Sequence, residues 1–268
     1  MDGLLLDTLE SGTVTEEQAF AIPVPPATHS YQPVANSNFV HLLDKVAGMN
    51  GLTLGERHYG VDRKGQRLFG TCSLEGQNFR GDTVAFMMGF RNSYDKSLAA
   101  AVCFGAKVFV CSNLVFTGYA DAESGIVGNV RHRHRPSITS GLFDRVKSAF
   151  GCFEAYKDYQ ENLYDRLEDT RLTQDQSYAT IIRAAKAEAI PQTHIIRVAN
   201  EYDNQLNQCP QSTDIEATAQ WHAFRHRNAF SLFNAFTEVH KDSQEKSPVV
   251  SNGRSISLSN FFHNEFMN

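Results

Sequence analysis

The chain has 268 residues, of which 41% are hydrophobic and 21% are charged, so it is long enough to bury a core as one domain or as two small ones. Its net charge of −5 and pI near 6.1 argue against a uniformly cationic nucleic-acid coat, although a local basic patch can still bind phosphate. Five widely spaced cysteines without a CxxC pair indicate neither a disulfide framework nor a zinc ribbon.

The first residues predict a protein that is neither exported nor embedded in a membrane. They carry acids where a secretory signal needs Lys or Arg. No apolar run approaches the ~20 residues that span a bilayer. Together with the cysteine usage, these features predict a location in the reducing cytoplasm of a bacterial host cell.

The first half of the chain predicts an extended arm, one helix and an antiparallel meander. Residues 1–37 are predicted as the arm, because the run Ile22-Pro23-Val24-Pro25-Pro26 favours extended backbone and lacks donors for a ladder. Residues 39–46 carry apolar side chains at helical spacing. Strand-like runs separated by Gly-rich or charged turns follow at residues 52–59, 67–74, 83–90 and, after a small-residue run, 106–111.

The second half predicts helices. Apolar residues recur every three or four positions from Leu142 onward, which predicts one long helix or two helices broken near Gly151. Thr173 with Gln176 predicts a capping box, and a further helix is expected at residues 195–206. A second capping box is predicted at the start of an aromatic-rich helix, from Thr213 and Glu216.

These patterns predict the α+β class, with an antiparallel β meander and helices in the N-terminal half and a helical C-terminal half. Four parts are expected along the chain. They are an extended N-terminal arm (1–37), an α+β domain (38–140), a helical region packed on it (141–246) and a C-terminal tail (247–268).

The polar stretch 91–96 between two apolar runs is the first candidate site. Its Asn, Ser and Asp residues favour a turn after a strand that stops near Phe90. One interpretation is a capped surface turn. The other is a binding loop, with Arg91 and Lys96 as anion contacts and Tyr94 as a stacking surface.

Three motifs resemble the phage- and plasmid-like proteins of an uncharacterised domain family. In that family an Asn-Ser-His-Asp turn precedes a strand ending in Val-Cys-x-Asn, and a late helix carries Asn-Ala-x-Thr-Glu. The matching residues here are Asn92, Ser93, Tyr94, Asp95, Cys111, Asn113, Asn234, Thr237 and Glu238. Tyr94 replaces the family's His, which argues against a metal ligand or an acid/base imidazole in the turn. The resemblance covers about residues 30–240 and implies a mobile-element origin rather than an activity.

A basic tract, Arg131-His132-Arg133-His134-Arg135, is the second candidate site. In an extended strand its three arginines project on one side, where they match a phosphate backbone. Lys147 adds to this patch, because residues 126–150 hold five Lys or Arg and only one acid. The alternative is a solvated loop that balances the acidic helix of residues 154–169.

No complete catalytic or metal motif is found. P-loop, GxSxG and GxGxxG patterns are missing from the sequence, so no cofactor is expected. His222 and His226 stand four apart on a predicted helix, but they lack an HExxH context. Thr237 and Glu238 are instead interpreted as buried partners for Arg91 or Lys96 that hold the two halves together.

The leading functional hypothesis is a non-catalytic nucleic-acid accessory protein of a phage or plasmid, acting in recombination, annealing or replication. The helix–meander–helix order is similar to the core of single-strand annealing recombinases, which implies DNA binding by a homo-oligomer. The alternative is a counter-defence or host-takeover protein that inhibits a bacterial enzyme, with the acidic helix as a DNA mimic. An unrecognised enzyme that uses Arg91, Asp95 and Glu238 is the third hypothesis.

Overall fold

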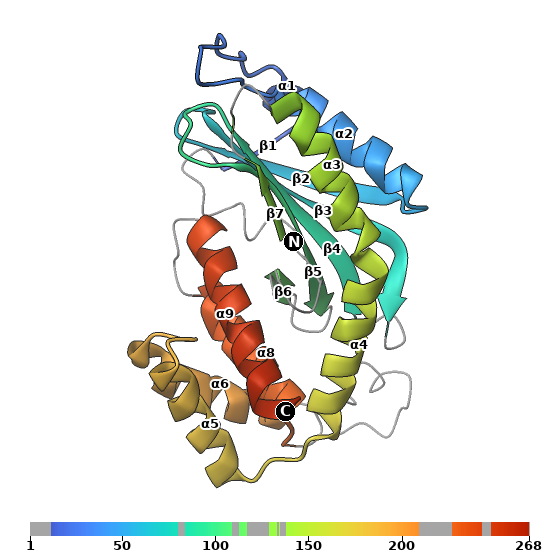
Figure 1. Ribbon diagram of the computed structural model, residues 1–268. Coiled ribbons are helices and arrows are strands. Elements are labelled where there is room, and N and C mark those ends of the chain that lie inside the picture. The colour runs from blue at the N-terminus through green and yellow to red at the C-terminus, as the bar shows by residue number, and fades with distance from the viewer. Residues whose placement is uncertain are drawn as a thin grey trace.

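The computed structural model describes residues 12–79, 84–108, 113–116, 129–132, 134, 138–208, 227–242 and 248–267. The fold is α+β, as the sequence predicts, with most strands in the first half and most helices in the second. Figure 1 shows a twisted sheet in the upper part of the molecule and a group of helices below it.

An antiparallel sheet forms the first half, and seven of its strands lie in the described residues. They are β1 (Thr13–Val14), β2 (Leu54–Asp62), β3 (Arg67–Phe79), β4 (Val84–Ser93), β5 (Ala100–Val108), β6 (Asn113–Phe116) and β7 (Asn129–His132). Strands β1 to β6 are neighbours in sequence order, and β7 pairs with β5 beside β6. Strands β1 to β6 form a meander, in which each strand pairs with the one before it.

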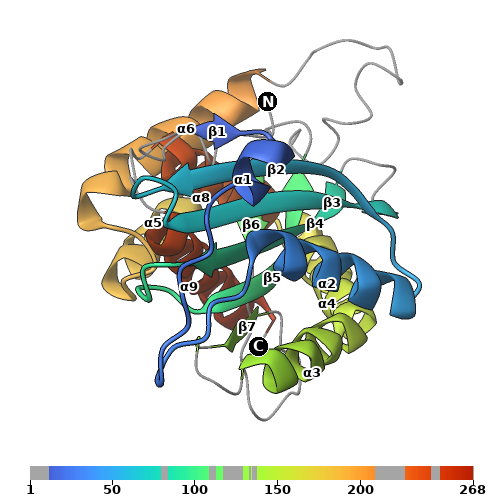
Figure 2. The same ribbon diagram turned by 90° about the horizontal axis from the view of Figure 1, so that it is seen from above.

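Helices cover the sheet and form the second half. They are α1 (Glu16–Phe20), α2 (Asn36–Met49), α3 (Ile138–Gly151), α4 (Phe153–Asp169), α5 (Gln174–Lys186), α6 (Ile195–Gln208) with the short 3₁₀ helix η1 (Gln192–His194) before it, α8 (Ala229–Asp242) and α9 (Pro248–Phe266). Helices α2 and α3 lie side by side against one face of the sheet (Figure 2).

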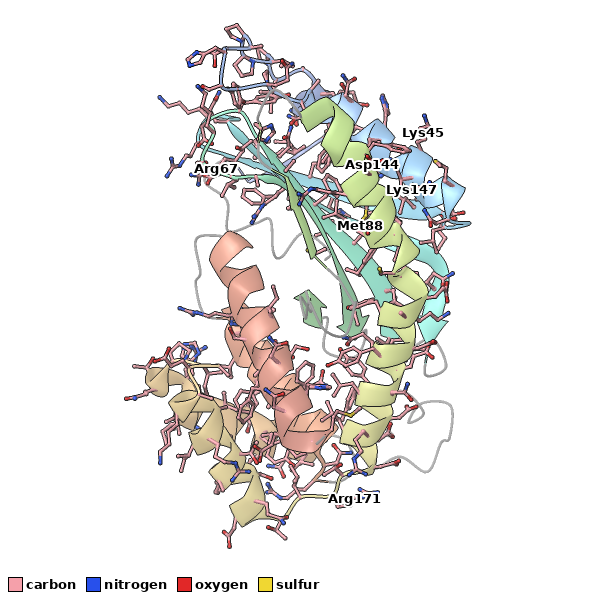
Figure 3. All side chains as sticks on the ribbon, in the orientation of Figure 1. Lys45, Arg67, Met88, Asp144, Lys147 and Arg171 are labelled. Atoms are coloured by element: carbon pink, nitrogen blue, oxygen red, sulfur yellow. The ribbon has the colours of Figure 1, made fainter. Side chains whose placement is uncertain are left out.

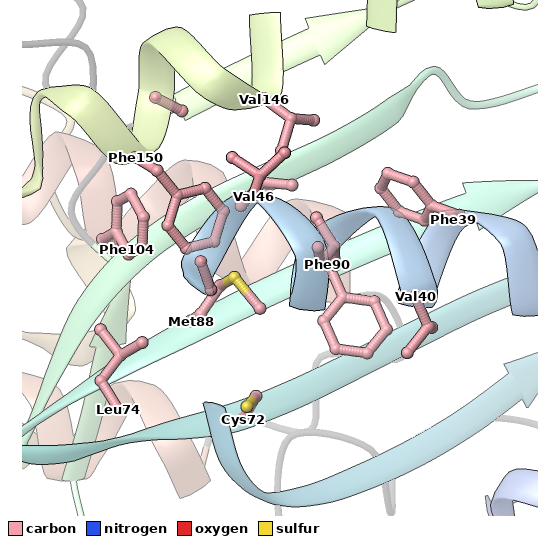
Figure 4. Packing of buried hydrophobic residues seen from close by; sticks show 14 of the residues in the cluster. Phe39, Val40, Val46, Cys72, Leu74, Met88, Phe90, Phe104, Val146 and Phe150 are labelled. Carbon is pink, nitrogen blue, oxygen red and sulfur yellow. The ribbon is translucent and has the colours of Figure 1, made fainter. Parts of the chain in front are cut away.

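The first core lies between that face and helices α2, α3 and α4. Side chains alternate across a strand, so Phe86, Met88 and Phe90 of β4 all point into it. The ring centroid of Phe90 lies 6.4 Å from that of Phe39 of α2 (Figure 4). It lies 5.9 Å from that of Tyr59 of β2. These edge-to-face contacts fix α2 on the sheet.

The second core joins the far end of the sheet to the helical region. Val84 and Ala106, at the ends of β4 and β5 distant from the 91–96 turn, pack with buried residues of α4, α5, α6, α8 and α9. Phe233 of α8 and Phe262 of α9 meet there edge to face, with ring centroids 4.9 Å apart. Helices α5, α6, α8 and α9 therefore pack against this end of the sheet, and α4 takes part in both cores.

Most predicted elements are present, and the differences have local causes. The predicted arm contains α1, which begins with a capping box between Thr15 and Gln18. The predicted C-terminal tail contains α9, where burial of Leu258 and Phe262 overrides the turn signal of Asn252-Gly253. Strand β4 continues past Phe90 to Ser93, because the ladder to β3 extends beyond the apolar run.

Other helix predictions agree with the structure. The break near Gly151 separates α3 from α4, and Thr173 with Gln176 forms the predicted capping box of α5. The later part of the predicted aromatic-rich helix is α8, which carries Phe230, Phe233 and Phe236. Its predicted capping box at Thr213 and Glu216 and the pair His222 and His226 lie outside the described residues.

Gly70 of β3 tests the packing of the first core. A Cβ at this position would lie 2.1 Å from the ring of Phe90, so Gly70→Ala is expected to lower the free energy of unfolding by about 1–3 kcal/mol. Gly48→Ala in α2 is the matched control, because a Cβ there meets nothing within 4 Å and alanine favours a helix. Urea denaturation measures both. Equal unfolding midpoints for the two variants would contradict this packing.

Candidate functional site

Two turns meet at the end of the sheet away from the helical region. One joins β2 to β3 at residues 62–67, and the other follows β4 at residues 93–100. The backbone N–H of Tyr94 donates to the carbonyl of Gln66 at 2.7 Å, and Arg67 is opposite Ser93 in the ladder. The two turns are thus held side by side by the backbone.

The first residues of the family motif are buried inside this end of the sheet. Asn92 is fully buried, and its Nδ2 donates at 2.8 Å to the carbonyl of Val34 and to Oδ1 of Asn36. The Ser93 hydroxyl donates to the carbonyl of Leu98 at 2.8 Å and accepts from the Leu98 N–H, which closes the turn. Both side chains hold backbone in place.

Tyr94 is also structural. It is only 5% exposed, and its hydroxyl accepts the N–H of Asn36, the first residue of α2, at 2.9 Å. Tyr31 packs beside it and donates its hydroxyl to the Tyr94 carbonyl at 3.1 Å, while burial raises the pKa of Tyr31 to about 12. The prediction that Tyr94 offers a stacking surface is wrong, because the ring faces the protein interior.

Charged side chains surround this buried turn. We call them the basic rim: Arg63, Lys64, Arg67, Arg91 and Lys96. Two acids lie among them. Asp95 accepts from Nε of Arg67 at 3.1 Å and pairs with Arg63 at 3.6 Å, and Asp62 pairs with Arg67 at 3.7 Å. Five basic groups against two acids leave an excess of positive charge at this end of the sheet.

Asp95 is held ionised by its neighbours. Partial burial raises its pKa, but hydrogen bonds from the side chain and backbone of Ser97 and the charge of Arg67 outweigh burial, so the pKa of Asp95 lies below its ordinary 3.8. The carboxylate therefore stays charged at neutral pH and anchors Arg67 across the two turns.

Three rim residues adopt left-handed backbone conformations. Arg63, Lys64 and Lys96 have φ values of 49°, 55° and 63°. All three are exposed, and the Arg63 side chain is 59% accessible. This conformation costs an L-residue roughly 1–2 kcal/mol relative to its usual backbone, and Gly or Asn adopts it more readily. The turns therefore carry long cations where their geometry favours other residues.

The basic tract approaches the rim through Tyr31. The Nζ of Lys96 lies 4.7 Å from the centroid of the Tyr31 ring, and the buried ring of His134 lies 5.8 Å from the same centroid. The Gln32 N–H donates to the His134 carbonyl at 3.3 Å. His134 thus lies next to Tyr31, which contacts the 91–96 turn.

Strand register places Arg131 near Arg91. Ala101 of β5 is opposite Arg91 on one side and Arg131 on the other, so the three backbone positions lie in one row across the strands. Two strand spacings, about 10 Å, separate the two arginine positions. Arg133 and Arg135 lie outside the described residues.

Lys147 does not belong to this row. It is exposed on α3, whose Val146 and Phe150 pack in the first core on the other face of the sheet. Figure 3 shows Lys147 beside α2 and Arg67 at the turn end of the sheet. The structure therefore does not bring Lys147 together with Arg91 and Arg131.

The late motif lies at the opposite end of the sheet. Thr237 donates its hydroxyl to the carbonyl of Asn234 within α8, and Asn234 donates to that of Phe230. Helix α8 contacts β6, which pairs with residues 105–108 of β5 rather than with the part opposite Arg91. Arg91 instead donates from Nε to the Ala99 carbonyl at 3.3 Å.

These positions bear on two predictions. Thr237 and Glu238 do not lie against Arg91 or Lys96, so the second core rather than this polar pairing joins the two halves. The catalytic hypothesis needed Glu238 to meet Arg91 and Asp95, and the structure does not bring them together. Asn113 begins β6 opposite Val108, and Cys111 lies outside the described residues.

The sequence interpretation missed three of the five rim residues. Arg63, Lys64 and Arg67 belong to a hairpin turn 30 positions before the 91–96 turn, and only strand register brings the two turns together. A signal was present, because the predicted turn 62–65 carries adjacent Arg and Lys before a Gly. Tyr31, in the predicted arm, was also missed.

Two absences apply to the described part of the chain. No helix in that part is long and apolar enough to cross a membrane. In the same residues, no three His, Cys, Asp or Glu side chains are placed to hold a metal ion.

The site and fold define an α+β protein with a rigid, positively charged turn cluster at one end of its sheet. The model of the family described as Domain of unknown function (DUF932) matches residues 27–257, and the chain belongs to this family. The match includes residues 28–36, both turns and the described helices from α2 to α8. No curated protein and no solved structure matches the chain.

Tyr94→Phe tests the structural role of the motif. Removing the hydroxyl leaves the Asn36 N–H buried without its acceptor, so the free energy of unfolding is expected to fall by about 1–3 kcal/mol. Tyr178→Phe on the half-buried face of α5 is the control and should cost less. Denaturant titration measures both variants. A Tyr94→Phe protein as stable as the wild type would contradict this role.

Asp95→Asn tests the ion-pair network through its pH dependence. At neutral pH the variant should unfold more easily, because Arg67 loses its charged partner. The pKa of Asp95 in the folded protein lies below 3.8. The higher free energy of unfolding of the wild type is therefore fully present above pH 3.8 and is lost as the pH falls through the lower pKa of the folded state. Denaturant titrations from neutral pH to about pH 2 measure the difference. Exposed Asp169 supplies the control Asp169→Asn, and a difference that persists in acid would exclude this explanation.

Proposed function

We propose that this protein binds nucleic acid through the basic rim and acts without catalysis. Its biological setting is that of an accessory protein of a phage or plasmid in recombination, annealing or replication. The observation that supports this proposal is the gathering of five basic side chains from two turns around only two acids.

The energetics of the turns favour a binding role over a passive one. Lys64 and Lys96 are exposed in left-handed conformations that asparagine or glycine adopts at lower cost. Backbone strain of this kind concentrates at functional sites, where a side chain is needed at a fixed point. Point charges on a rigid turn suit phosphates, which fix register and supply most of the affinity for nucleic acid.

The neighbourhood of the rim extends the same chemistry. Arg131 is placed in the row of Arg91, and His134 packs on Tyr31 beneath Lys96. A phosphate backbone that crosses the rim would therefore meet the basic tract next. The helix–meander–helix order, similar to the core of annealing recombinases, supports the same proposal by analogy.

The double variant Lys64→Asn/Lys96→Asn separates binding from stability. Asparagine accepts the left-handed backbone, so the free energy of unfolding should stay the same or rise. Affinity for labelled single- and double-stranded DNA, measured by fluorescence anisotropy at several salt concentrations, should fall. The slope of log K against log salt should become shallower by about two, one for each lost phosphate contact.

The matched control is Lys45→Gln/Lys147→Gln, which removes the same charge from helices α2 and α3, outside the rim. It should leave the slope unchanged, and an equal loss in both variants would mean that net charge alone acts. Wild-type affinity in the rim variant would overturn the proposal.

A second candidate function has one observation in its favour. Glu154, Asp158, Glu161 and Asp165 follow the outer side of α4 at spacings of four, three and four residues, opposite its buried face. Successive carboxylates are about 5 Å apart along the axis. Such a stripe fits an inhibitor of a host nucleic-acid enzyme that mimics DNA. Pull-down of host proteins by the wild type, lost in Asp158→Asn/Glu161→Gln, would support it.

A further inference from the structure

The surface around the α5–α6 connection combines exposed apolar groups with basic ones. Ile182 of α5 is 47% exposed and Ile196 of α6 is 68% exposed, which is unusual for isoleucine in a folded chain. Lys186 lies one turn after Ile182, and Arg197 follows Ile196. We call this region, with the cavity it surrounds, the α5–α6 surface.

A cavity of about 280 Å³ opens on this surface. Its lining consists of Ala185, Glu188, Ile190, Pro191, Gln192 and Arg254. It forms where the chain reverses between α5 and η1, and Glu188 adopts a left-handed φ of 58° there while the Ala189 N–H donates to the Ala184 carbonyl at 2.9 Å. Arg254 reaches the cavity from α9, so three helices build it.

Basic groups gather around the cavity. Burial first, and then the charges of Arg197 and Arg254, lower the pKa of His194, which shows that both guanidinium groups act on this imidazole. Arg183 of α5 is already paired with Glu265. Glu188 is the one acid among the residues that line the cavity. The surface thus fits a helix face that carries several carboxylates.

The same chain presents such a face on its other side. The acidic stripe of α4, residues 154–165, is directed away from the second core. Helix α8 lies between the two surfaces, because α4 contacts α8 on one side while α6 contacts α8 and α5 contacts α6 on the other. Figure 1 shows α4 and the α5–α6 pair on opposite sides of the helical region.

We propose that the α5–α6 surface is a docking site for the acidic stripe of α4 of a second copy of this chain. The stripe supplies carboxylates to Lys186, Arg197 and Arg254, and the exposed isoleucines pack against the neighbouring helix. Because the two surfaces differ and lie on opposite sides, the contact is head-to-tail and repeats from copy to copy. It closes into a ring or continues as a filament.

Sedimentation equilibrium of the full chain tests this interface. At low ionic strength the wild type should show masses that are multiples of 29.9 kDa, and it should dissociate as salt screens the charges. The variants Asp158→Lys/Glu161→Lys and Lys186→Glu/Arg197→Glu should each be monomeric. Lys45→Glu on α2, outside both surfaces, should assemble like the wild type.

Mixing the two monomeric variants gives the decisive result. One retains an intact α5–α6 surface and the other an intact acidic stripe, and their two reversed surfaces also have opposite charges. An equimolar mixture should therefore assemble although neither variant does so alone. Combining all four reversals in one chain should restore assembly for the same reason. A wild type that stays monomeric, variants that keep its mass, or a mixture that stays monomeric would overturn the proposal.

Separate control experiments test the folding of these variants and the independence of assembly from DNA binding. Thermal melts followed by circular dichroism test whether the charge-reversal variants fold. Ile196→Ser, at a largely exposed position, should weaken assembly without a change of charge, because it removes an apolar contact of the interface. The rim variant Lys64→Asn/Lys96→Asn should assemble like the wild type. Failure of assembly and failure of nucleic-acid binding are therefore distinguishable.

Discussion

The buried hydrogen bonds between the 92–94 turn and the start of α2 are the contact on which the arrangement of this protein depends. The Asn92 side chain bonds to residues 34 and 36, and the Tyr94 hydroxyl accepts the first N–H of α2. Breaking either bond would leave polar groups without partners in the protein interior, where the cost is high. The motif residues of the 92–94 turn therefore join the end of β4 to the N-terminal segment by buried hydrogen bonds.

These hydrogen bonds explain how the turn can hold the charged side chains of the basic rim at fixed positions. The Asn92 amide and the Tyr94 hydroxyl bond to residues 34 and 36, the Ser93 hydroxyl bonds to Leu98, and Asp95 with Arg67 ties the turn to the neighbouring hairpin. The exposed cations consequently rest on two turns that cannot move independently. A rigid support of this kind favours binding, because little side-chain and loop entropy is lost when a ligand arrives.

The molecule has two ends with different chemistry. The basic rim and the first core lie toward one end of the sheet, and the second core with its acidic and basic helix surfaces lies toward the other. About seven residues of β4, or roughly 23 Å at 3.3 Å per residue, separate Val84 in the second core from Arg91 in the rim. Nucleic-acid binding at one end is thus compatible with self-association at the other.

The sequence alone determined the α+β class, the meander, the break between α3 and α4 and the capping box of α5, because these follow from local periodicity and turn chemistry. It also identified Arg91, Lys96 and Arg131 as basic positions near turns or strands. It did not determine which other residues lie beside them. Arg63, Lys64 and Tyr31 join them only through strand register and the burial of Tyr31 beside the 91–96 turn, while Lys147 and Glu238 are placed elsewhere by the helices that carry them. The reason is physical: a local pattern fixes which face of an element is apolar, whereas the partner of that face is chosen by packing and hydrogen bonds between segments distant in the chain.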